Sequence, residues 1–214
     1  MATQLFFKKA LFIIIPLLSY NECINAQWVK TAGPQGMNVN VFYQRGNTLF
    51  AGTSPKGVFK SLDNGVSWIA ANNRIADKNV FSFIANNNFL FAGTDSGVFR
   101  SPDNGVTWQA VNSGIEGKFV YSFKFAKGFL FAGTSSGLYK SPDEGITWFD
   151  AGGGGISSSI IHDITFAPPH LVVIADNLIF YSDNNGNSWN ATNNSPFVFG
   201  VNPSFLTRHD SILV

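Results

Sequence analysis

Asp77 and Asp163 are the residues of this 214-residue sequence best suited to acid–base chemistry. Two carboxylates about 5–9 Å apart can hydrolyse a glycosidic bond, which makes this pair a candidate for the cleavage of glycans. His162 stands next to Asp163, but adjacent residues of a strand point to opposite faces, so the two do not form an obvious dyad. The structural alternative for Asp163 is a carboxylate satisfied by backbone groups or water.

Metal and nucleophile chemistry receive no support from the sequence. The three histidines, at positions 162, 170 and 209, lack the spacing of metal ligands, and there is no Gly-x-Ser-x-Gly nucleophile elbow. The single cysteine excludes an internal disulfide framework and a cysteine-rich metal site. We therefore expect no metal and no cofactor.

The composition narrows the class of partner. Charged residues make up 13% of the chain, aromatic residues make up 15%, and the formal net charge is +1. Soluble domains usually contain about 25% charged residues, so charge is scarce here, and no basic excess is present to attract nucleic acid. We expect a folded domain that does not bind nucleic acid.

Residues 1–26 predict a secretory signal peptide. Lys8 and Lys9 precede a short apolar stretch, and Ala26 is a small residue at the cleavage position. The stretch is shorter than the roughly 20 residues that a membrane span needs, and the alternative is an uncleaved anchor. Cleavage leaves 12 of the 14 basic and 12 of the 13 acidic residues, a neutral chain. We expect an exported protein, periplasmic, cell-surface or extracellular, without a stable membrane span.

A repeat of about 40 residues organises residues 27–214. Every tryptophan lies on one grid, at positions 28, 68, 108, 148 and 189. Residues 49–68, 90–108 and 130–148 are near-copies of one another, and residues 171–189 are a weaker copy. A fixed period of this length is the signature of a repeat fold.

Each unit predicts four short strands. In the third unit they cover residues 121–125, 129–132, 137–140 and 147–149, with Gly, Asn and Asp in the turns between them. Four strands in about 40 residues match one propeller blade, with a solenoid as the runner-up. We predict an all-β protein, a β-propeller of four-stranded blades with about four complete blades, ending near residues 68, 108, 148 and 189, and a partial fifth at 203–214. The strand around Trp28 would close a five-bladed ring; alternatively, the chain is a fragment of a larger propeller.

The most specific motif is a hairpin turn, S-x-D-x-G-x-[ST]-W, that leads into each tryptophan. Its aspartate can accept backbone N–H bonds, its glycine supplies a positive φ, and its tryptophan brings apolar area between blades. The fourth copy has Asn in place of Asp, which can accept the same bonds without charge. We expect a structural role for all of these residues: Ser61, Asp63, Gly65, Trp68, Ser101, Asp103, Gly105, Trp108, Ser141, Asp143, Gly145, Trp148, Ser182, Asn184, Gly186 and Trp189.

This motif resembles the Asp-box of sialidase-type (BNR) repeats, also carried by sortilin-like receptors, xyloglucan-cleaving endoglucanases and photosystem II assembly factor propellers. The resemblance implies that the turns lie at the blade periphery, away from any active site. It does not extend to sialidase chemistry, which needs an arginine cluster and a Tyr–Glu nucleophile pair. The mature chain has four arginines, and the Arg-Ile-Pro motif of sialidases is absent. A xyloglucanase-like glycoside hydrolase acting through Asp77 and Asp163 is the alternative to a binding protein.

The segments that differ between repeats form the expected binding surface. They are residues 69–79, 109–118, 150–159 and 190–203, and the strand order places them at the end of each blade opposite the Asp-box turns. We expect a non-catalytic module that binds a protein or a glycan there. The candidate binding residues are Arg74, Asp77, Asp95, Glu116 and Asp150.

One aligned position of the first strand also differs between units. It holds Val41, Ser82, Ser122, Asp163 and Ser204, so Asp163 is the only carboxylate in this column.

Overall fold

The computed structural model describes residues 33, 36–75, 78–192, 208–209 and 212–213. The chain divides into two units, Met1–Lys30 and Thr31–Val214, and all of the described residues belong to the second. The predictions for the signal peptide, Trp28, Asp77 and Ser204 therefore lie outside the described residues.

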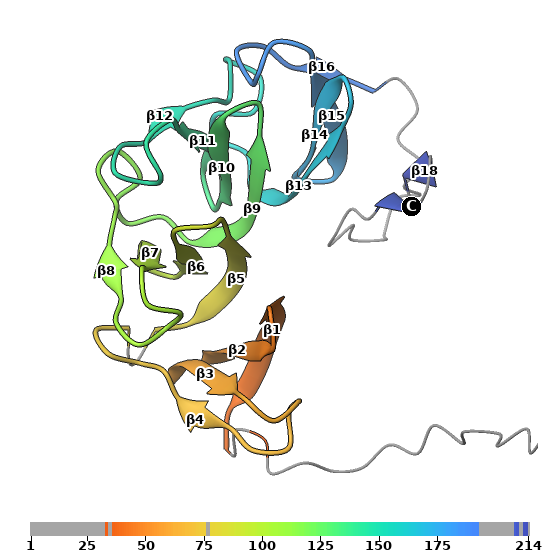
Figure 1. Ribbon diagram of the computed structural model, residues 1–214. Helices are drawn as coiled ribbons and strands as arrows, with labels where there is room; N and C mark the ends of the chain where they lie inside the picture. Colours follow the sequence, from red (N-terminus) through yellow and green to blue (C-terminus); the bar gives the residue numbers. More distant parts are fainter. Residues whose placement is uncertain (1–32, 34–35, 76–77, 193–207, 210–211, 214) are drawn as a thin grey trace, which may run out of the picture. The chain divides into compact units, whose positions relative to one another are not determined.

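The described residues form four sheets, each of four antiparallel strands in sequence order (Figure 1). The first sheet has β1 (Asn38–Arg45), β2 (Thr48–Ser54), β3 (Gly57–Ser61) and β4 (Ile69–Ala70). The second has β5 (Val80–Ala85), β6 (Leu90–Thr94), β7 (Gly97–Ser101) and β8 (Gln109–Ala110). The third has β9 (Val120–Ala126), β10 (Phe129–Thr134), β11 (Gly137–Ser141) and β12 (Phe149–Asp150), and the fourth has β13 (Ile161–Ala167), β14 (His170–Ala175), β15 (Leu178–Ser182) and β16 (Asn190–Ala191).

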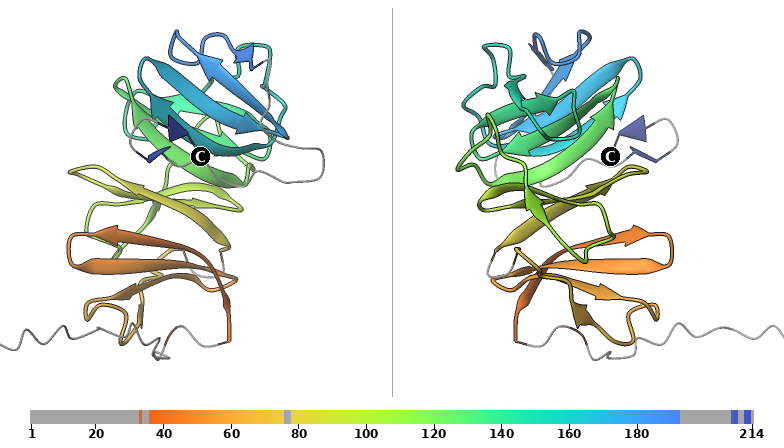
Figure 2. Two further views of the ribbon diagram at one scale, coloured as in Figure 1. Left: turned by 90° about the vertical axis from the view of Figure 1, so that its right-hand side faces the viewer. Right: turned by 60° about the vertical axis from the view of Figure 1, so that its left-hand side comes forward.

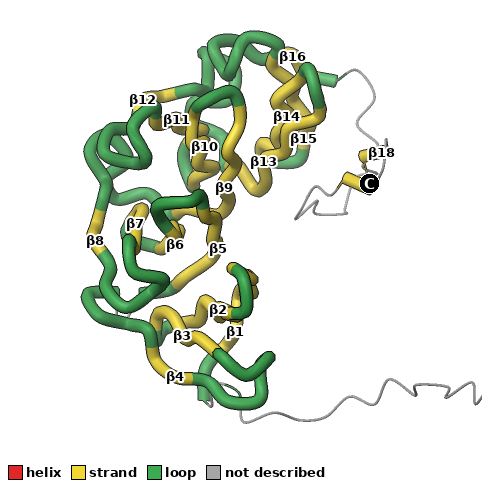
Figure 3. Tube along the Cα trace, in the orientation of Figure 1, coloured by secondary structure: helices red, strands yellow, loops and turns green. Residues whose placement is uncertain are grey.

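A two-stranded antiparallel sheet follows, with β17 (Arg208–His209) and β18 (Ile212–Leu213). The described part of the chain contains strands and loops only (Figure 3). None of it forms a helix long and apolar enough to cross a membrane. These elements confirm the predicted partial β-propeller of four four-stranded blades.

The core lies between the sheets. Each of three buried clusters combines side chains from two successive sheets: Phe50 with Trp108, Phe91 with Trp148, and Phe131 with Ile161 are examples. The stacking of one sheet on the next can be followed in the two views of Figure 2. Burial on both faces explains why strands such as β6 and β10 are apolar at successive positions rather than alternating.

The first strands of neighbouring sheets contact one another: β1 with β5, β5 with β9, and β9 with β13. The approach is close enough to require a glycine in the second strand. A Cβ atom on Gly93 would lie 2.6 Å from the carbonyl oxygen of Val120 in the next sheet. The repeated glycine of the L-F-A-G-T segment therefore sets how tightly successive sheets stack.

The fourth strand begins later than the sequence predicts. In the third sheet, β12 starts at Phe149 and not at residue 147. Thr147 is still part of the turn, because its backbone N–H donates to Asp143 Oδ1 (2.9 Å) and its hydroxyl donates to Asp143 Oδ2 (2.6 Å). Local side-chain bonds thus delay the start of strand pairing.

Candidate functional site

The two ends of the sheets are built from different parts of the repeat. At the turn end lie the hairpins between first and second strands and the S-x-D-x-G-x-[ST]-W turns between third and fourth strands, which we call the repeat turns (residues 61–68, 101–108, 141–148 and 182–189). Arg45, at the end of β1, joins these parts across two sheets. Its guanidinium donates to the carbonyl oxygens of Asn86 (3.0 Å) and Asn87 (3.1 Å) and to Asn104 Oδ1 (3.5 Å).

At the opposite end, which we call the loop end, the inter-sheet connections meet the turns between second and third strands. Backbone hydrogen bonds join them: Gly57 N–H to the Lys78 carbonyl (3.0 Å), Asp95 N–H to the Asn79 carbonyl (3.1 Å), and Ser135 N–H to the Phe119 carbonyl (2.9 Å). This is the grouping that the strand order predicts.

The three repeat turns that contain an aspartate are closed by the same set of hydrogen bonds, and in the fourth the Asn184 amide donates to Ser188 Oγ (2.8 Å) instead. In the second turn, Ser101 Oγ accepts the Gly105 N–H (2.8 Å) and donates to Asp103 Oδ1 (2.8 Å). Asp103 also accepts the backbone N–H of Thr107 (2.8 Å) and its hydroxyl (2.5 Å). Asn104 takes a left-handed φ of 57°, a requirement that the sequence analysis did not anticipate.

The turn aspartates are held in their charged form. Burial raises the pKa of Asp103, but hydrogen bonds from Thr107, Ser101 and Val106 outweigh it and lower the pKa to about 2. The Ser67 side chain is the main cause that lowers the pKa of Asp63 to about 2. In the fourth turn Asn184 Oδ1 accepts the Ser188 N–H (2.9 Å), so the geometry survives without a charge.

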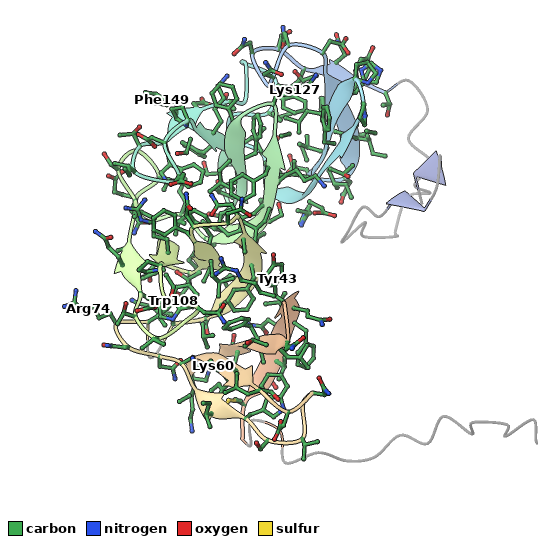
Figure 4. The ribbon with its side chains drawn as sticks, in the orientation of Figure 1. Tyr43, Lys60, Arg74, Trp108, Lys127 and Phe149 are labelled. Carbon is green, nitrogen blue, oxygen red and sulfur yellow. The ribbon has the colours of Figure 1, made fainter. Side chains whose placement is uncertain are left out.

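The turn tryptophans tie each sheet to the preceding one. The Nε1–H of Trp108 (Figure 4) donates to the Ala71 carbonyl (2.8 Å), and Trp148 donates in the same way to Val111 (2.9 Å). Trp189 continues the series with the carbonyl of residue 151 (2.7 Å). Trp68 differs, because its Nε1–H donates to Gly65 in its own turn (3.1 Å).

Lysine and arginine side chains of the third strands also connect neighbouring sheets. Lys60 Nζ donates to the Asn104 carbonyl (3.4 Å), and Arg100 Nη1 donates to the Glu144 carbonyl (3.1 Å), in each case in the repeat turn of the next sheet. Lys140 Nζ repeats the contact with the Asn185 carbonyl (3.2 Å). The repeated charges of the turn end are therefore engaged in holding neighbouring sheets together.

At the loop end, the candidate acidic residues accept hydrogen bonds from the connections and turns around them. Asp95 accepts the Asn79 side-chain amide (2.6 Å), Asp150 accepts the Gly152 N–H (2.6 Å), and Glu116 accepts the Gly114 N–H (3.0 Å). Backbone hydrogen bonds lower the pKa of Glu116. Asp150 and Glu116 contact groups of their own segments, whereas Asp95 joins the β6–β7 turn to the connection before β5, so these bonds do not bring the three residues together into one site.

Arg74 lies in the connection between β4 and β5, with its side chain exposed and directed outward (Figure 4). It has a left-handed φ of 69° and follows Asn73, whose carbonyl accepts the Trp108 N–H (3.2 Å). Two further asparagines of the connections are structural. Asn72 Oδ1 accepts the Val58 N–H (2.6 Å), and Asn112 Oδ1 accepts the Val98 N–H (2.7 Å).

The first strands carry β-bulges near their starts. The register shifts between Val80 and Ser82 in β5 and between Ile161 and Asp163 in β13, with matching irregularities in β1 and β9. A bulge breaks the strict alternation of faces, so the alternation argument against a His162–Asp163 pair does not apply at this position. Asp163 Oδ1 accepts the Ile164 N–H (2.8 Å), and Ser82 Oγ donates to the Val120 carbonyl (3.2 Å).

Three aromatic residues gather beside these bulges. Phe81, Phe119 and Tyr121, which we call the aromatic cluster, come from β5, from the residue before β9 and from β9. The ring of Phe81 lies 6.1 Å from that of Phe119, at an interplanar angle of 26°, and 5.5 Å from that of Tyr121, at 54°. The Phe119 side chain is 43% exposed, and burial raises the pKa of Tyr121.

Sequence reasoning missed the aromatic cluster, although a signal for it was present. The position that precedes the inner-strand column reads Asn40, Phe81, Tyr121 and His162 in the four units. The two aromatic residues fall in neighbouring units at the position where the bulge occurs. An alignment of the position before the inner-strand column would have identified Phe81 and Tyr121.

The part of the chain that the structure describes contains no candidate metal site. There, no three His, Cys, Asp or Glu side chains gather in a group that could hold a metal ion. The two-carboxylate pair depends on Asp77, which lies outside that part.

No protein-family profile and no curated protein matches the sequence. Solved structures do match. The extracellular domain of BT4673, assigned to a one-component system of B. thetaiotaomicron, has a TM-score of 0.67 and 15% identity, over 86% of this chain and 26% of its own. An ancestral GH74 enzyme has a TM-score of 0.59 and 21% identity, over 71% and 23%.

YCF48 bound to a D1 peptide has a TM-score of 0.52 and 20% identity, over 72% of this chain and 52% of its own. The chain thus spans about a quarter of the length of the first two proteins and about half of the third. At these identities the likeness concerns the fold alone, and that fold is the β-propeller.

Proposed function

We propose that this chain is an exported, non-catalytic Asp-box β-propeller that binds a protein or a glycan at the loop end. One observation carries the proposal: the repeated polar residues of the turn end are engaged in closing turns and joining sheets, whereas the loop end differs in sequence between sheets and exposes Arg74 and the Phe119 ring. Two similar structures are compatible with a binding role, since one is an extracellular domain and another contains a bound peptide. The signal peptide that the sequence predicts at residues 1–26 is the reason for including export in the proposal.

The proposal is tested by locating the binding surface. The full chain is screened against a glycan array and a displayed peptide library, and every hit is remeasured with Arg74→Glu and Phe119→Ser at the loop end and Val106→Ser at the turn end. Val106 is a suitable control because it is 55% exposed in a repeat turn. Loss of binding in a loop-end variant, with the turn-end variant unchanged, supports the proposal. Loss confined to the turn-end variant contradicts it.

Glycoside hydrolysis is the second candidate, supported by the GH74 enzymes among the similar structures. It would be a xyloglucanase-like activity with Asp77 and Asp163 as the carboxylates. The test is turnover of aryl glycosides and β-glucans by the wild type and by the Asp77→Asn and Asp163→Asn variants. If the wild type turns over a substrate and each substitution abolishes this turnover, the chain is a glycoside hydrolase that uses both carboxylates. Absence of turnover, or turnover that neither substitution changes, removes this candidate.

A further inference from the structure

One face of the first sheet carries the side chains with which the second sheet packs on the first. In the second sheet, five residues of the shared core do this packing: Val80, Phe83, Leu90, Ala92 and Trp108. The equivalent positions of the first sheet, which we call the receiving face, hold the same five residue types: Val39, Phe42, Leu49, Ala51 and Trp68. A sheet face of this composition is stable when another sheet covers it.

The receiving face is exposed where its counterpart is buried. Phe42 is 65% exposed, whereas Phe83 is 8% exposed. Trp68 is half-buried, whereas Trp108 is 1% exposed. The two ring centroids of Phe42 and Trp68 lie 5.9 Å apart, and those of Phe83 and Trp108 lie 6.5 Å apart, so both sheets contain the same aromatic pair. A contiguous exposed surface of this kind is typical of an interaction site.

The interfaces inside the chain show what kind of group covers such a face. Where the first sheet covers the second, the second-strand residue Phe50 lies against Gly105 of the repeat turn. The same covering sheet supplies the Ala71 carbonyl that accepts the Trp108 Nε1–H (2.8 Å). Both contacts recur where the second sheet covers the third. Gly65 and Trp68 are the corresponding groups of the first sheet, so the occupant that fits them is a four-stranded sheet of this repeat.

The fourth sheet presents the complementary half of this interface. Val58 of the first sheet and Leu138 of the third belong to the cores with the following sheets and are fully buried, whereas Ile179, at the same position of β15, is half-buried. The Thr192 N–H donates to the Ile179 carbonyl (3.0 Å), as the Ala71 N–H donates to the Val58 carbonyl (2.8 Å). Residue 192 therefore corresponds to the residue whose carbonyl accepts a tryptophan N–H in the interfaces inside the chain.

We infer that the receiving face of one copy of this chain binds the fourth sheet of a second copy. A receiving face at one end of the series and its complement at the other make a heterologous, head-to-tail contact. Such a contact repeats between copies the packing that already joins successive sheets within one copy. The inference concerns the sheet faces and does not depend on the proposed function.

The test measures self-association of the full chain by analytical ultracentrifugation over a series of concentrations. Phe42→Glu places a charge on the receiving face, and Ile179→Glu places one on the fourth sheet. Phe149→Glu is the control, because it charges an exposed phenyl position (56%) in the third sheet, outside both surfaces. Circular dichroism verifies that each variant is folded, and Phe42→Ser and Ile179→Ser replace any glutamate variant that is not.

We expect the mean mass of the wild type to rise with concentration, and Phe42→Glu and Ile179→Glu each to weaken this association about tenfold or more. Phe149→Glu should associate as the wild type does. A mixture of Phe42→Glu and Ile179→Glu should form a 1:1 complex, because the intact receiving face of one variant can bind the intact fourth sheet of the other. That complex should not grow further, because its two remaining surfaces are both charged.

A wild type that stays monomeric at every concentration overturns the inference, whether another part of the chain or nothing covers Phe42. Association that Phe42→Glu weakens but Ile179→Glu does not would mean that two first sheets pack on each other, and it overturns the head-to-tail contact. Equal weakening by Phe149→Glu would show unspecific association and overturns it as well. The absence of a complex in the mixture, with both variants folded, has the same consequence.

Discussion

The turn end and the loop end of the sheets differ in what their side chains contact. At the turn end, one set of side-chain bonds recurs from turn to turn, and the tryptophans and cations reach into the neighbouring sheet. At the loop end, Asn72 and Asn112 make the same bonds in the first two connections, but Asp95, Glu116 and Asp150 each bond differently, and the Phe119 ring remains exposed. In a repeat protein, residues that recur hold the fold, and residues that differ are available for a ligand. Substitutions at the turn end should therefore cost more stability than substitutions at the loop end.

Loss of a turn tryptophan should have the largest effect. Trp148 is 3% exposed and donates to Val111 of the preceding sheet, so Trp148→Ala should cost about 3–5 kcal/mol in free energy of unfolding. Trp68 is half-buried and bonds only to its own turn among the described residues, so Trp68→Ala should cost less than half as much. Urea unfolding followed by circular dichroism measures both. Equal costs would show that the contact between sheets is not what makes Trp148 important.

A methyl group on a turn glycine should have the next largest effect. Gly105 and Gly65 have φ values of 80° and 90°, so alanine at either position is strained by about 1–2 kcal/mol. At Gly105 the added Cβ would also lie 2.9 Å from Phe50 Cε1 of the preceding sheet, whereas at Gly65 the nearest atom is 3.7 Å away. Gly105→Ala should therefore cost at least about 1 kcal/mol more than Gly65→Ala, measured by denaturant unfolding. The opposite order would contradict the packing described for this turn.

The charge of a turn aspartate should have a smaller, pH-dependent effect. The pKa of Asp103 is about 2 in the folded chain and 3.8 when unperturbed, so its carboxylate stabilises the fold above pH 4, and this contribution disappears as the pH falls toward 2. Asp103→Asn should reduce stability modestly at pH 7, because the Asn184 turn shows that an amide supports the same geometry. The difference between wild type and variant should shrink on acidification. Thermal unfolding of both proteins at several pH values measures this difference in stability. A difference that does not change with pH would contradict the lowered pKa of Asp103.

Substitution in the aromatic cluster should change stability least. Phe119 is 43% exposed and lies outside the three cores, so Phe119→Ser should shift the free energy of unfolding by about 0.5 kcal/mol or less. The same urea unfolding experiment measures this. A loss comparable with that of Trp148→Ala would mean that the ring supports the fold and is not available to a ligand.

Most of the fold was predictable because it repeats. The tryptophans recur every 40 or 41 residues, and each is preceded by the same turn with a glycine and an aspartate or asparagine. Because this pattern occurs four times, the sequence alone indicates four blades and the turn-closing role of Asp63, Asp103 and Asp143. The start of β12 was predicted two residues early, because the Thr147 bonds to Asp143 could not be weighed against strand pairing.

The candidate site was harder to predict, because it depends on tertiary geometry. Asp95, Glu116 and Asp150 have residue types suited to binding, and only the structure shows that Glu116 and Asp150 close their own loops and that Asp95 joins its turn to the connection before β5. Phe81 and Tyr121 are 40 residues apart and meet because both strands bulge at the equivalent position. Strand alternation, on which the sequence argument relied, fails at a bulge.

The location of a bound ligand tests the division between the two ends most directly. Amide hydrogen exchange of the full chain is measured by mass spectrometry with and without a saturating selected peptide. We expect increased protection at residues 80–82 and 119–122, at the loop end, and no change in the repeat turns at residues 101–108 and 141–148. Protection of the repeat turns, with residues 119–122 unchanged, would contradict it.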